Sequence, residues 1–313
     1  MSPILVTGAA GFIGSHTVDQ LLAAGLAVSG VDNFRTGRRT NLEHALASPA
    51  FTLHEADITA GDTLDRLVAT TRPASIIHLA ALVSVQESIA DPALNYLLNL
   101  HATHLVAEAA RTHGVPRLVF ASSAAIYGDN PAFPLHESAD KNPISPYGAA
   151  KLASEALLLG HGRSFGLTVR CQRYFNVFGP RQDPASPYSG VISIFARRYR
   201  EGLPPTLFGD GGQTRDFISV HDVARANLLA ATRPAIPSGA TNICTGRATS
   251  LQEVVQVFQS HYPRISPPLR AAPRSGDILH SRGAPEKATA ELGFAAAIGI
   301  EAGLGELILS RSA

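Results

Sequence analysis

A tyrosine and a lysine four residues apart, Tyr147 and Lys151, are the side chains in this sequence best placed to move a proton. That spacing brings both to one face of a helix. A free tyrosine has a pKa of about 10, but a neighbouring ammonium favours the phenolate. The other lysines of the chain are only Lys141 and Lys287. The scarcity of lysine favours a proton-transfer site over an ordinary solvated helix face.

A glycine-rich loop near the N-terminus indicates where a dinucleotide could bind. Gly8, Gly11 and Gly14 follow the apolar run 4–6. Such a loop at a helix N-terminus brings backbone N–H groups to a pyrophosphate. The glycine spacing is weak support by itself, but Asp32 ends the next expected strand. A carboxylate there accepts hydrogen bonds from the adenosine ribose and repels a 2′-phosphate, so NAD is favoured over NADP.

Two points near this site stay open at the level of sequence. Arg35, Arg38 and Arg39 follow Asp32 closely, and arginines at this place could hold a 2′-phosphate. Asp57 follows the third expected strand and could either meet the adenine or cap a helix.

Two serines, Ser122 and Ser123, follow the expected strand 117–121. Ligands of open α/β sheets bind at the carboxyl ends of the strands, so one of these hydroxyls could hold a substrate hydroxyl. Helix capping or turn formation explains the same two residues equally well.

Short apolar runs and helix-type segments alternate along the first part of the chain. The runs are near-continuous, as is typical of parallel strands covered on both faces, and helical patterns such as 17–24 and 94–112 lie between them. The expected strands are 4–6, 27–31, 51–55, 75–79, 117–121 and 168–172. This alternation predicts an α/β fold with a doubly wound, Rossmann-type parallel sheet, and we assign 1–175 to an NAD-binding domain.

The pattern changes after residue 175. Residues 179–187 are rich in Pro, Asp and Ser, and shorter elements with many Gly and Pro follow, including helices near 251–261 and 304–309. We therefore expect 176–313 to form a smaller mixed α/β substrate-binding domain. The strand-like and helix-like run near 216–245 is expected to return to the first domain.

The composition of the 313-residue chain limits the classes of partner. Its formal net charge is +1 and 16% of residues are charged, which does not favour nucleic acid or acidic membranes as partners. No run approaches the ~20 apolar residues of a membrane span, and the N-terminus lacks the basic region of a signal peptide. Cys171 and Cys244 lie in apolar runs and are expected to be buried thiols of a cytoplasmic protein. His101 and His104 lack a third ligand, so no metal is expected.

Several longer motifs make the sequence similar to a known family. It resembles the extended short-chain dehydrogenase/reductase proteins that act on nucleotide sugars, and within them the UDP-glucose/UDP-galactose 4-epimerase branch, over nearly its whole length. The matching segments are V-D-N-F-R-T-G at 31–37, H-L-A-A at 78–81, Y-F-N-V-F-G-P-R at 174–181, G-D-G at 209–211, T-R-D-F at 214–217 and R-S-G-D at 274–277.

The resemblance implies a role for each matching residue. Tyr147 would be the catalytic base, Lys151 its partner, and Ser123 the holder of the sugar hydroxyl. The cofactor-binding residues it implies are Gly8, Gly11, Phe12, Ile13, Gly14, Asp32, Asn33, Asp57, Ile58, Leu79, Ala80, Ala81, Asn99, Ser122, Tyr147, Lys151 and Tyr174. The substrate-binding residues it implies are Ser84, Ser123, Tyr147, Asn176, Val191, Thr206, Arg215, Arg274, Asp277 and Ser281. Arginine suits a diphosphate because its planar guanidinium makes two parallel hydrogen bonds.

The sequence departs from relatives at three places. Related dehydratases and decarboxylases carry an acid two places before the Y-G of the serine segment, and here that place is Ala125, preceded by Ala124. Many 4-epimerases carry a lysine after H-x-A-A, where this chain has V-S-V at 83–85. The bulky residue that closes the sugar pocket in relatives falls on Ser281, and a small residue there leaves room for an N-acetyl group.

The function expected from the resemblance is NAD-dependent 4-epimerisation of a UDP-sugar through a transient 4-keto sugar. UDP-glucose and UDP-galactose are the first candidates and the N-acetylated pair is a further one. UDP-glucuronate 4-epimerisation, nucleotide-sugar dehydration and a non-catalytic NAD-binding sensor remain alternatives.

Relatives pair the helices near 94–112 and 147–159 across a twofold axis. Both segments here carry apolar residues beyond one core stripe, such as Leu97 and Val106, so a homodimer is expected.

Overall fold

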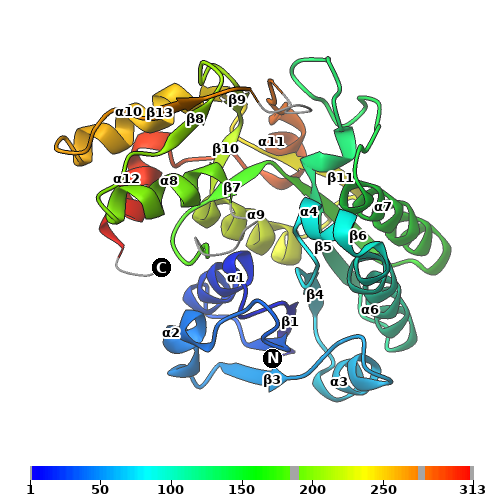
Figure 1. Cartoon of the computed structure of the whole chain (residues 1–313). Coiled ribbons are helices and arrows are strands. Elements are labelled where there is room, and N and C mark those ends of the chain that lie inside the picture. The colour runs from blue at the N-terminus through cyan, green and yellow to red at the C-terminus, as the bar shows by residue number, and fades with distance from the viewer. Residues whose placement is uncertain (1, 184–189, 274–278, 311–313) are drawn as a thin grey trace.

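Seven parallel strands form the central sheet of the protein, in the order β11-β6-β5-β4-β1-β2-β3 (Figure 1). The structure, a computed structural model, describes residues 2–183, 190–273 and 279–310. The strands are β1 (Ile4–Thr7), β2 (Val28–Asp32), β3 (Phe51–Glu55), β4 (Ser75–His78), β5 (Arg117–Ser123), β6 (Thr168–Tyr174) and β11 (Gly239–Ile243). The predicted α/β fold with a doubly wound parallel sheet is confirmed.

Helices cover both faces of this sheet because successive apolar residues of a strand point to opposite faces. Val6 of β1 belongs to one apolar cluster and Leu5 to the other. The first cluster is covered by α1 (Phe12–Ala23), α2 (Glu43–Leu46), α9 (Val220–Thr232) and α11 (Glu286–Leu292). The second is covered by α3 (Thr63–Thr71), α6 (Ala102–Thr112) and α7 (Pro146–Phe165).

The order of strands reverses beside β1, which pairs with β2 on one side and with β4 on the other. In open α/β sheets a crevice for ligands forms at such a point, at the carboxyl ends of the strands. The segments that follow β1, β2, β4 and β5 are therefore brought to the edge where the glycine-rich loop and the two serines lie.

The helix expected over 94–112 is divided in the structure. It consists of α5 (Pro92–Asn95), a π-helical turn (Tyr96–His101) and α6, and it is preceded by α4 (Val85–Ala90). Val106 is fully buried in the core, whereas Leu97 is exposed. Of these two residues, which we placed beyond the core-facing stripe, Val106 instead packs against the sheet and Leu97 is exposed as expected.

The second half of the chain builds a smaller body from short elements. Its described residues contain three two-stranded pairings: β7 (Asn176–Phe178) with β10 (Phe217–Ser219), β9 (Thr214–Arg215) with β12 (Thr249–Ser250), and β8 (Thr206–Phe208) with β13 (Leu269–Ala271). The helices α8 (Val191–Arg200), α10 (Leu251–His261) and α12 (Ile300–Leu309) enclose an apolar cluster of their own. Figure 1 shows these helices on the upper left, away from α6 and α7.

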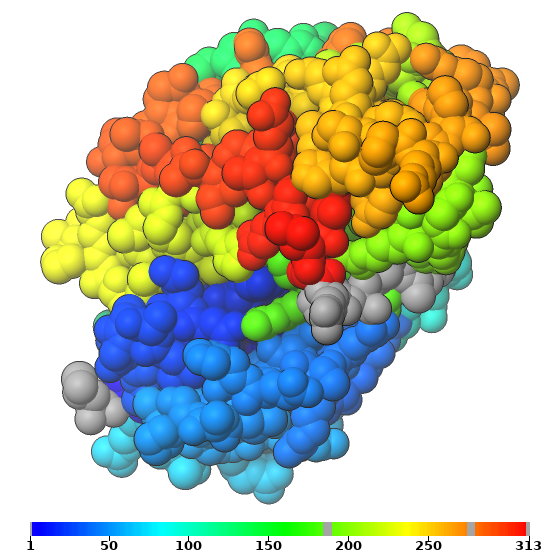
Figure 2. All heavy atoms as spheres, turned by 90° about the vertical axis from the view of Figure 1, so that its left-hand side faces the viewer, coloured from blue at the N-terminus to red at the C-terminus, as the bar shows by residue number. Residues whose placement is uncertain are grey.

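Part of the second half lies with the first. Strand β11 pairs with β6, and α9 packs against α1, where the Asn227 amide donates to Thr17 Oγ1 at 3.0 Å. Figure 2 shows the yellow segment over the blue N-terminal part, with the orange and red segments above it. Cys171 and Cys244 are buried free thiols, as expected. Within the described residues, no helix has the length and apolar character required to span a bilayer.

Candidate active site

The first turn of α7 places Tyr147 at the edge of the sheet. Ser145 precedes the helix, and its hydroxyl accepts a hydrogen bond from the Gly148 N–H at 3.1 Å. The Tyr147 N–H donates to Ser88 Oγ of α4, also at 3.1 Å. The start of α7 is thus held both by its own cap and by a neighbouring helix.

Lys151 lies one helical turn further on and is 3% exposed. Its Nζ donates to the carbonyl of Ala121 at 2.9 Å and lies 4.8 Å from the centre of the Phe120 ring and 5.9 Å from that of Tyr147. Burial lowers the pKa of Lys151 to about 7. The predicted pair therefore shares one face of α7, with the ammonium facing the end of β5.

The hydroxyl of Tyr147 is hydrogen-bonded to Ser123. Burial nevertheless raises the pKa of Tyr147, although the bond to Ser123 opposes this. In the chain alone, desolvation of the phenol therefore outweighs its interaction with Ser123. A lowered phenol pKa requires a further positive charge brought by a bound molecule.

The two adjacent serines face different surroundings. Ser123 Oγ accepts from the Ala125 N–H at 3.1 Å, so it caps a short turn in addition to contacting Tyr147. Ser122 is buried and donates to Glu155, whose carboxylate forms a buried ion pair with Arg173 at 2.8 Å. The hydroxyl of Ser122, implied by the resemblance to bind cofactor, is thus engaged within the protein.

The glycine-rich loop is shaped by close backbone approaches. Gly8 has a φ of +70°, and a Cβ there would lie 2.8 Å from the Ala80 nitrogen at the end of β4. A Cβ on Gly14 would lie 1.9 Å from the Gly8 carbonyl oxygen. Gly11 precedes α1 without a side-chain cap, so the N–H groups of Phe12 and Ile13 begin the helix with no partner inside it. This geometry suits a pyrophosphate.

The end of β4 is fixed against this loop by Thr7. Thr7 Oγ1 lies 2.7 Å from His78 Nδ1 and accepts from the N–H groups of Leu79 and Ala80 at 3.2 Å each. Burial lowers the pKa of His78 to about 3, so this ring is neutral. The H-x-A-A stretch, with Ala81 at its end, therefore forms one wall of the predicted cofactor site.

Asp32 stands at the end of β2, beside the glycine-rich loop. It is 8% exposed, and its two oxygens accept from the N–H groups of Ala10 and Phe34 at 2.8 Å each. The raised pKa of Asp32 is caused by burial, which these two hydrogen bonds oppose. The position agrees with the predicted ribose-binding role.

Asp57 is close to the same place. Its carboxylate accepts from Asn33 Nδ2 at 3.0 Å and from the Thr59 N–H at 2.8 Å. The residue that precedes α3 is Asp62, so the helix-capping alternative for Asp57 is wrong. Ile58, beside it, is buried in the core.

Two predicted cofactor residues have their polar atoms engaged by the protein. The Asn99 side chain, in the π-helical turn, makes two hydrogen bonds with the Leu82 backbone, at 3.0 and 3.1 Å. The Tyr174 hydroxyl donates to Asn227 Oδ1 at 2.5 Å. In this structure both residues support the walls of the site.

The predicted nucleotide end is built around β9. The Ser281 N–H donates to the Thr214 carbonyl at 3.1 Å, and the Thr214 N–H donates to the Leu279 carbonyl at 2.9 Å. These bonds place Ser281 in a strand-like pairing beside Arg215 rather than in a surface turn. Its side chain is half-buried. Arg274 and Asp277 lie outside the described residues.

The remaining predicted substrate residues lie on separate elements. Ser84 is buried and caps α4, accepting from the Glu87 N–H at 2.9 Å. Asn176 begins β7 and is exposed, Val191 begins α8, and Thr206 begins β8.

Asp216 also lies at this end, and its role was not predicted from the sequence. It is fully buried, and its carboxylate accepts from the N–H and hydroxyl of Thr245, from Gly246 N–H and from Gly283 N–H, at 2.7–3.2 Å. It thereby ties the segment after β9 to two others. The sequence signal for this role is an acidic residue that stands between Arg215 and a strand-like apolar run.

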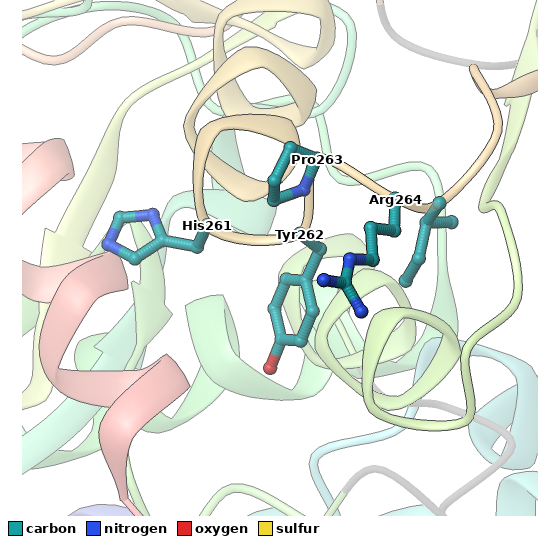
Figure 3. A pocket seen from close by; sticks show the side chains of 5 residues that line it. His261, Tyr262, Pro263 and Arg264 are labelled. Carbon is teal, nitrogen blue, oxygen red and sulfur yellow. The ribbon is translucent and has the colours of Figure 1, made fainter.

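A shallow hollow lies elsewhere, at the end of α10 (Figure 3). Its lining is five consecutive residues, 261–265, and α10 is distant from α7 in Figure 1. None of the predicted site residues lines it. Among the described residues, no three His, Cys, Asp or Glu side chains gather as metal ligands.

Comparisons with known proteins agree on one group. The model of the NAD dependent epimerase/dehydratase family matches residues 4–244. The UDP-glucose 4-epimerase of Mycolicibacterium smegmatis is 39% identical over 305 residues, covering 97% of this chain and 96% of that protein.

Two solved structures extend the comparison. The UDP-glucose 4-epimerase of Thermus thermophilus, complexed with NAD, is 38% identical with a TM-score of 0.87, covering 98% of this chain and 99% of that one. The UDP-N-acetylglucosamine 4-epimerase of Methanobrevibacter ruminantium, in complex with UDP-N-acetylmuramic acid, is 34% identical with a TM-score of 0.92, covering 98% and 97%.

Proposed function

The chain belongs to the NAD dependent epimerase/dehydratase family, and on that premise we propose that it is an NAD-dependent UDP-sugar 4-epimerase. UDP-glucose and UDP-galactose are the proposed pair, with UDP-GlcNAc and UDP-GalNAc as a second pair. One observation supports this proposal most strongly. Tyr147, Ser123 and Lys151 lie close together at the carboxyl ends of the strands, where the glycine-rich loop also lies.

The residues around that loop fit a dinucleotide. Side chains larger than hydrogen at Gly8 and Gly14 would collide with the backbone that forms the cradle. The N–H groups at the start of α1 suit the pyrophosphate, and Asp32 suits the ribose. When bound, NAD would supply a hydride acceptor and donor at the sugar C4.

The protein's own groups move the proton. Tyr147 removes the proton from the C4 hydroxyl, while Ser123, bonded to the phenol, orients that hydroxyl. The buried Lys151 lies beside the phenol and has a pKa of about 7. A negative charge on the phenolate therefore favours the protonated amine, which in turn stabilises the phenolate. Arg215 would hold the nucleotide diphosphate while the 4-keto sugar turns and presents its other face.

A dehydratase would need an acid to expel a hydroxyl. Ala124 and Ala125 occupy the turn next to Ser123, where such an acid would stand in related dehydratases. The turn therefore favours the epimerase.

We propose that two parts of the chain bind different ligands. Residues 1–175, with the returning segment near 216–245, hold NAD, and 176–313 hold the nucleotide sugar. The pairing of β11 with β6 and the position of Arg215 beside Ser281 support this division.

We also propose a cytoplasmic homodimer formed through the region of α4 to α7. Ile89, Tyr96 and Leu97 expose apolar surface there, at 54%, 57% and 39%. Light scattering should give twice the 32.9 kDa chain mass at micromolar concentration, and a particle of the chain mass would contradict the dimer. Cell fractionation tests the location.

One experiment tests the reaction. The purified protein is incubated with UDP-glucose, UDP-galactose, their N-acetylated counterparts and UDP-glucuronate, and products are separated by chromatography, with Tyr147→Phe as the control. We expect interconversion within the 4-epimer pairs without net oxidation. Loss of water from the sugar would identify a dehydratase. Tightly held NAD with no turnover of any sugar would identify a binding protein.

A further inference from the structure

Three arginines stand close to Asp32, where a 2′-phosphate on the adenosine ribose would lie. In this structure each is paired with a carboxylate that comes from another part of the chain. The pairs are Arg35 with Glu87, Arg38 with Asp183 (2.8 Å), and Arg39 with Glu55 (3.6 Å).

Backbone contacts place Arg38 beside the ribose-binding carboxylate. The Arg38 N–H donates to the Ala10 carbonyl at 3.1 Å, and the Ala10 N–H donates to Asp32 Oδ2 at 2.8 Å. A Cβ on the intervening Gly37 would lie 2.9 Å from Asp32 Oδ1. Arg38 and Asp32 thus flank the same stretch of the glycine-rich loop.

Arg35 follows Asp32 closely along the chain. The Phe34 N–H donates to Asp32, and the Arg35 N–H donates to Asn33 Oδ1 at 3.0 Å. The Arg35 guanidinium turns to Glu87 of α4, the helix capped by Ser84. An arginine at this position would otherwise be a suitable partner for a 2′-phosphate.

The loop that carries Asp183 is anchored independently. Arg181 pairs with Asp19 of α1 at 2.7 Å, and the Pro180 carbonyl bonds with His16 of α1 at 3.0 Å. Figure 2 shows a green segment lying against the blue N-terminal part. The Asp183 carboxylate is therefore brought to Arg38 by a loop already fixed on α1.

We propose that Glu87 and Asp183 determine the preference for NAD over NADP by engaging Arg35 and Arg38. This rests on the proposed use of NAD. Asp32 repels a 2′-phosphate directly, and the two remote carboxylates withhold the guanidinium groups that would attract one. Each pair is partly exposed, so breaking it costs the fold little.

The test uses Asp183→Asn, Glu87→Gln and the double variant, with Glu55→Gln as the matched control. Arg39 and Glu55 are both more than 60% exposed and lie further apart than the other two pairs. Each protein is incubated with an excess of NAD and NADP in equal amounts. Free nucleotide is then removed, and the nucleotide released on denaturation is quantified.

We expect the NADP:NAD ratio to rise about tenfold for Asp183→Asn, the size of one charge-assisted hydrogen bond gained, and further for the double variant. Arg38→Gln combined with Asp183→Asn should return the ratio to that of the wild type. An unchanged ratio in both single variants, or an equal rise in Glu55→Gln, would overturn the inference. If the wild type retained neither dinucleotide, the proposed function itself would fail.

Discussion

The proton-transfer end of the site and the nucleotide end are built in different ways. Tyr147 and Lys151 share one long helix that packs on the central sheet, and Lys151 is almost fully buried. Arg215 stands on a two-residue strand, and its neighbour Ser281 belongs to a segment paired with that strand through a few backbone bonds. The first end is fixed by packing, whereas the second is held together by backbone hydrogen bonds and by one buried carboxylate, Asp216.

The difference matches the two tasks. Proton transfer needs a fixed distance between donor and acceptor, which a buried, hydrogen-bonded helix terminus provides. A site that accepts different sugars needs a wall whose side chains can be substituted without disturbing the core. Substitutions at the two ends should therefore differ in both the size and the kind of their effects.

The largest effect is expected at the proton-transfer end. Tyr147→Phe should lower kcat by about 100-fold or more, the usual cost of removing a positioned general base. The KM for the UDP-sugar should change little because the ring remains. Steady-state kinetics with UDP-glucose measure both values. Near-normal turnover would disprove the proposed mechanism.

At the nucleotide end, Asp216→Asn should raise KM roughly 10- to 30-fold with little change in kcat. The new amide NH2 would face N–H donors, so the segments at Thr245 and Gly283 would lose their common anchor. Asp222→Asn is the matched control, since Asp222 is equally buried but ties Ala297 and Ile298 to α9. If both variants raised KM alike, general destabilisation would be the cause.

Ser281→Tyr tests whether the side chain at position 281 determines which sugars are accepted. The tyrosine should fill the space proposed for the N-acetyl group and lower kcat/KM for UDP-GlcNAc and UDP-GalNAc about tenfold or more, while sparing UDP-glucose. Ser281→Ala controls for loss of the hydroxyl. Equal losses for both substrate pairs would show that Ser281 does not gate the sugar.

The smallest effect concerns stability. The pKa of Lys151 is about 7 in the folded chain and about 10.4 in an unfolded one, so between these pH values the unfolded state binds more protons. The contribution of Lys151 to stability therefore increases from pH 7 to pH 9.

In nucleotide-free buffer, the Tm of the wild type relative to Lys151→Met should rise by roughly 2–4 °C over this interval. Thermal unfolding at both pH values provides the measurement, with the exposed Lys287→Met as control. A difference independent of pH would mean that Lys151 keeps an ordinary pKa.

The sequence predicted the central sheet well because its strands are buried on both faces, and continuous apolar runs such as 117–121 have few other interpretations. It predicted the meeting of Tyr147 and Lys151 from helical spacing alone. Both successes rest on local periodicity.

What the sequence could not provide depends on burial and on distant partners. The direction of the Tyr147 pKa shift follows from desolvation, which spacing does not reveal. The engagement of Ser122 by Glu155 and the anchoring role of Asp216 depend on segments far along the chain. The π-helical turn that interrupts the helix over 94–112 leaves no mark on its apolar pattern.

The pairing of β11 with β6 has a consequence for how the protein is made. The edge of β6 stays uncovered during synthesis until the chain has grown past residue 243. An open strand edge of this kind invites pairing with other nascent chains, and contacts between distant segments form slowly. Production should therefore benefit from low temperature and chaperones, and a fragment ending at residue 175 should aggregate rather than fold.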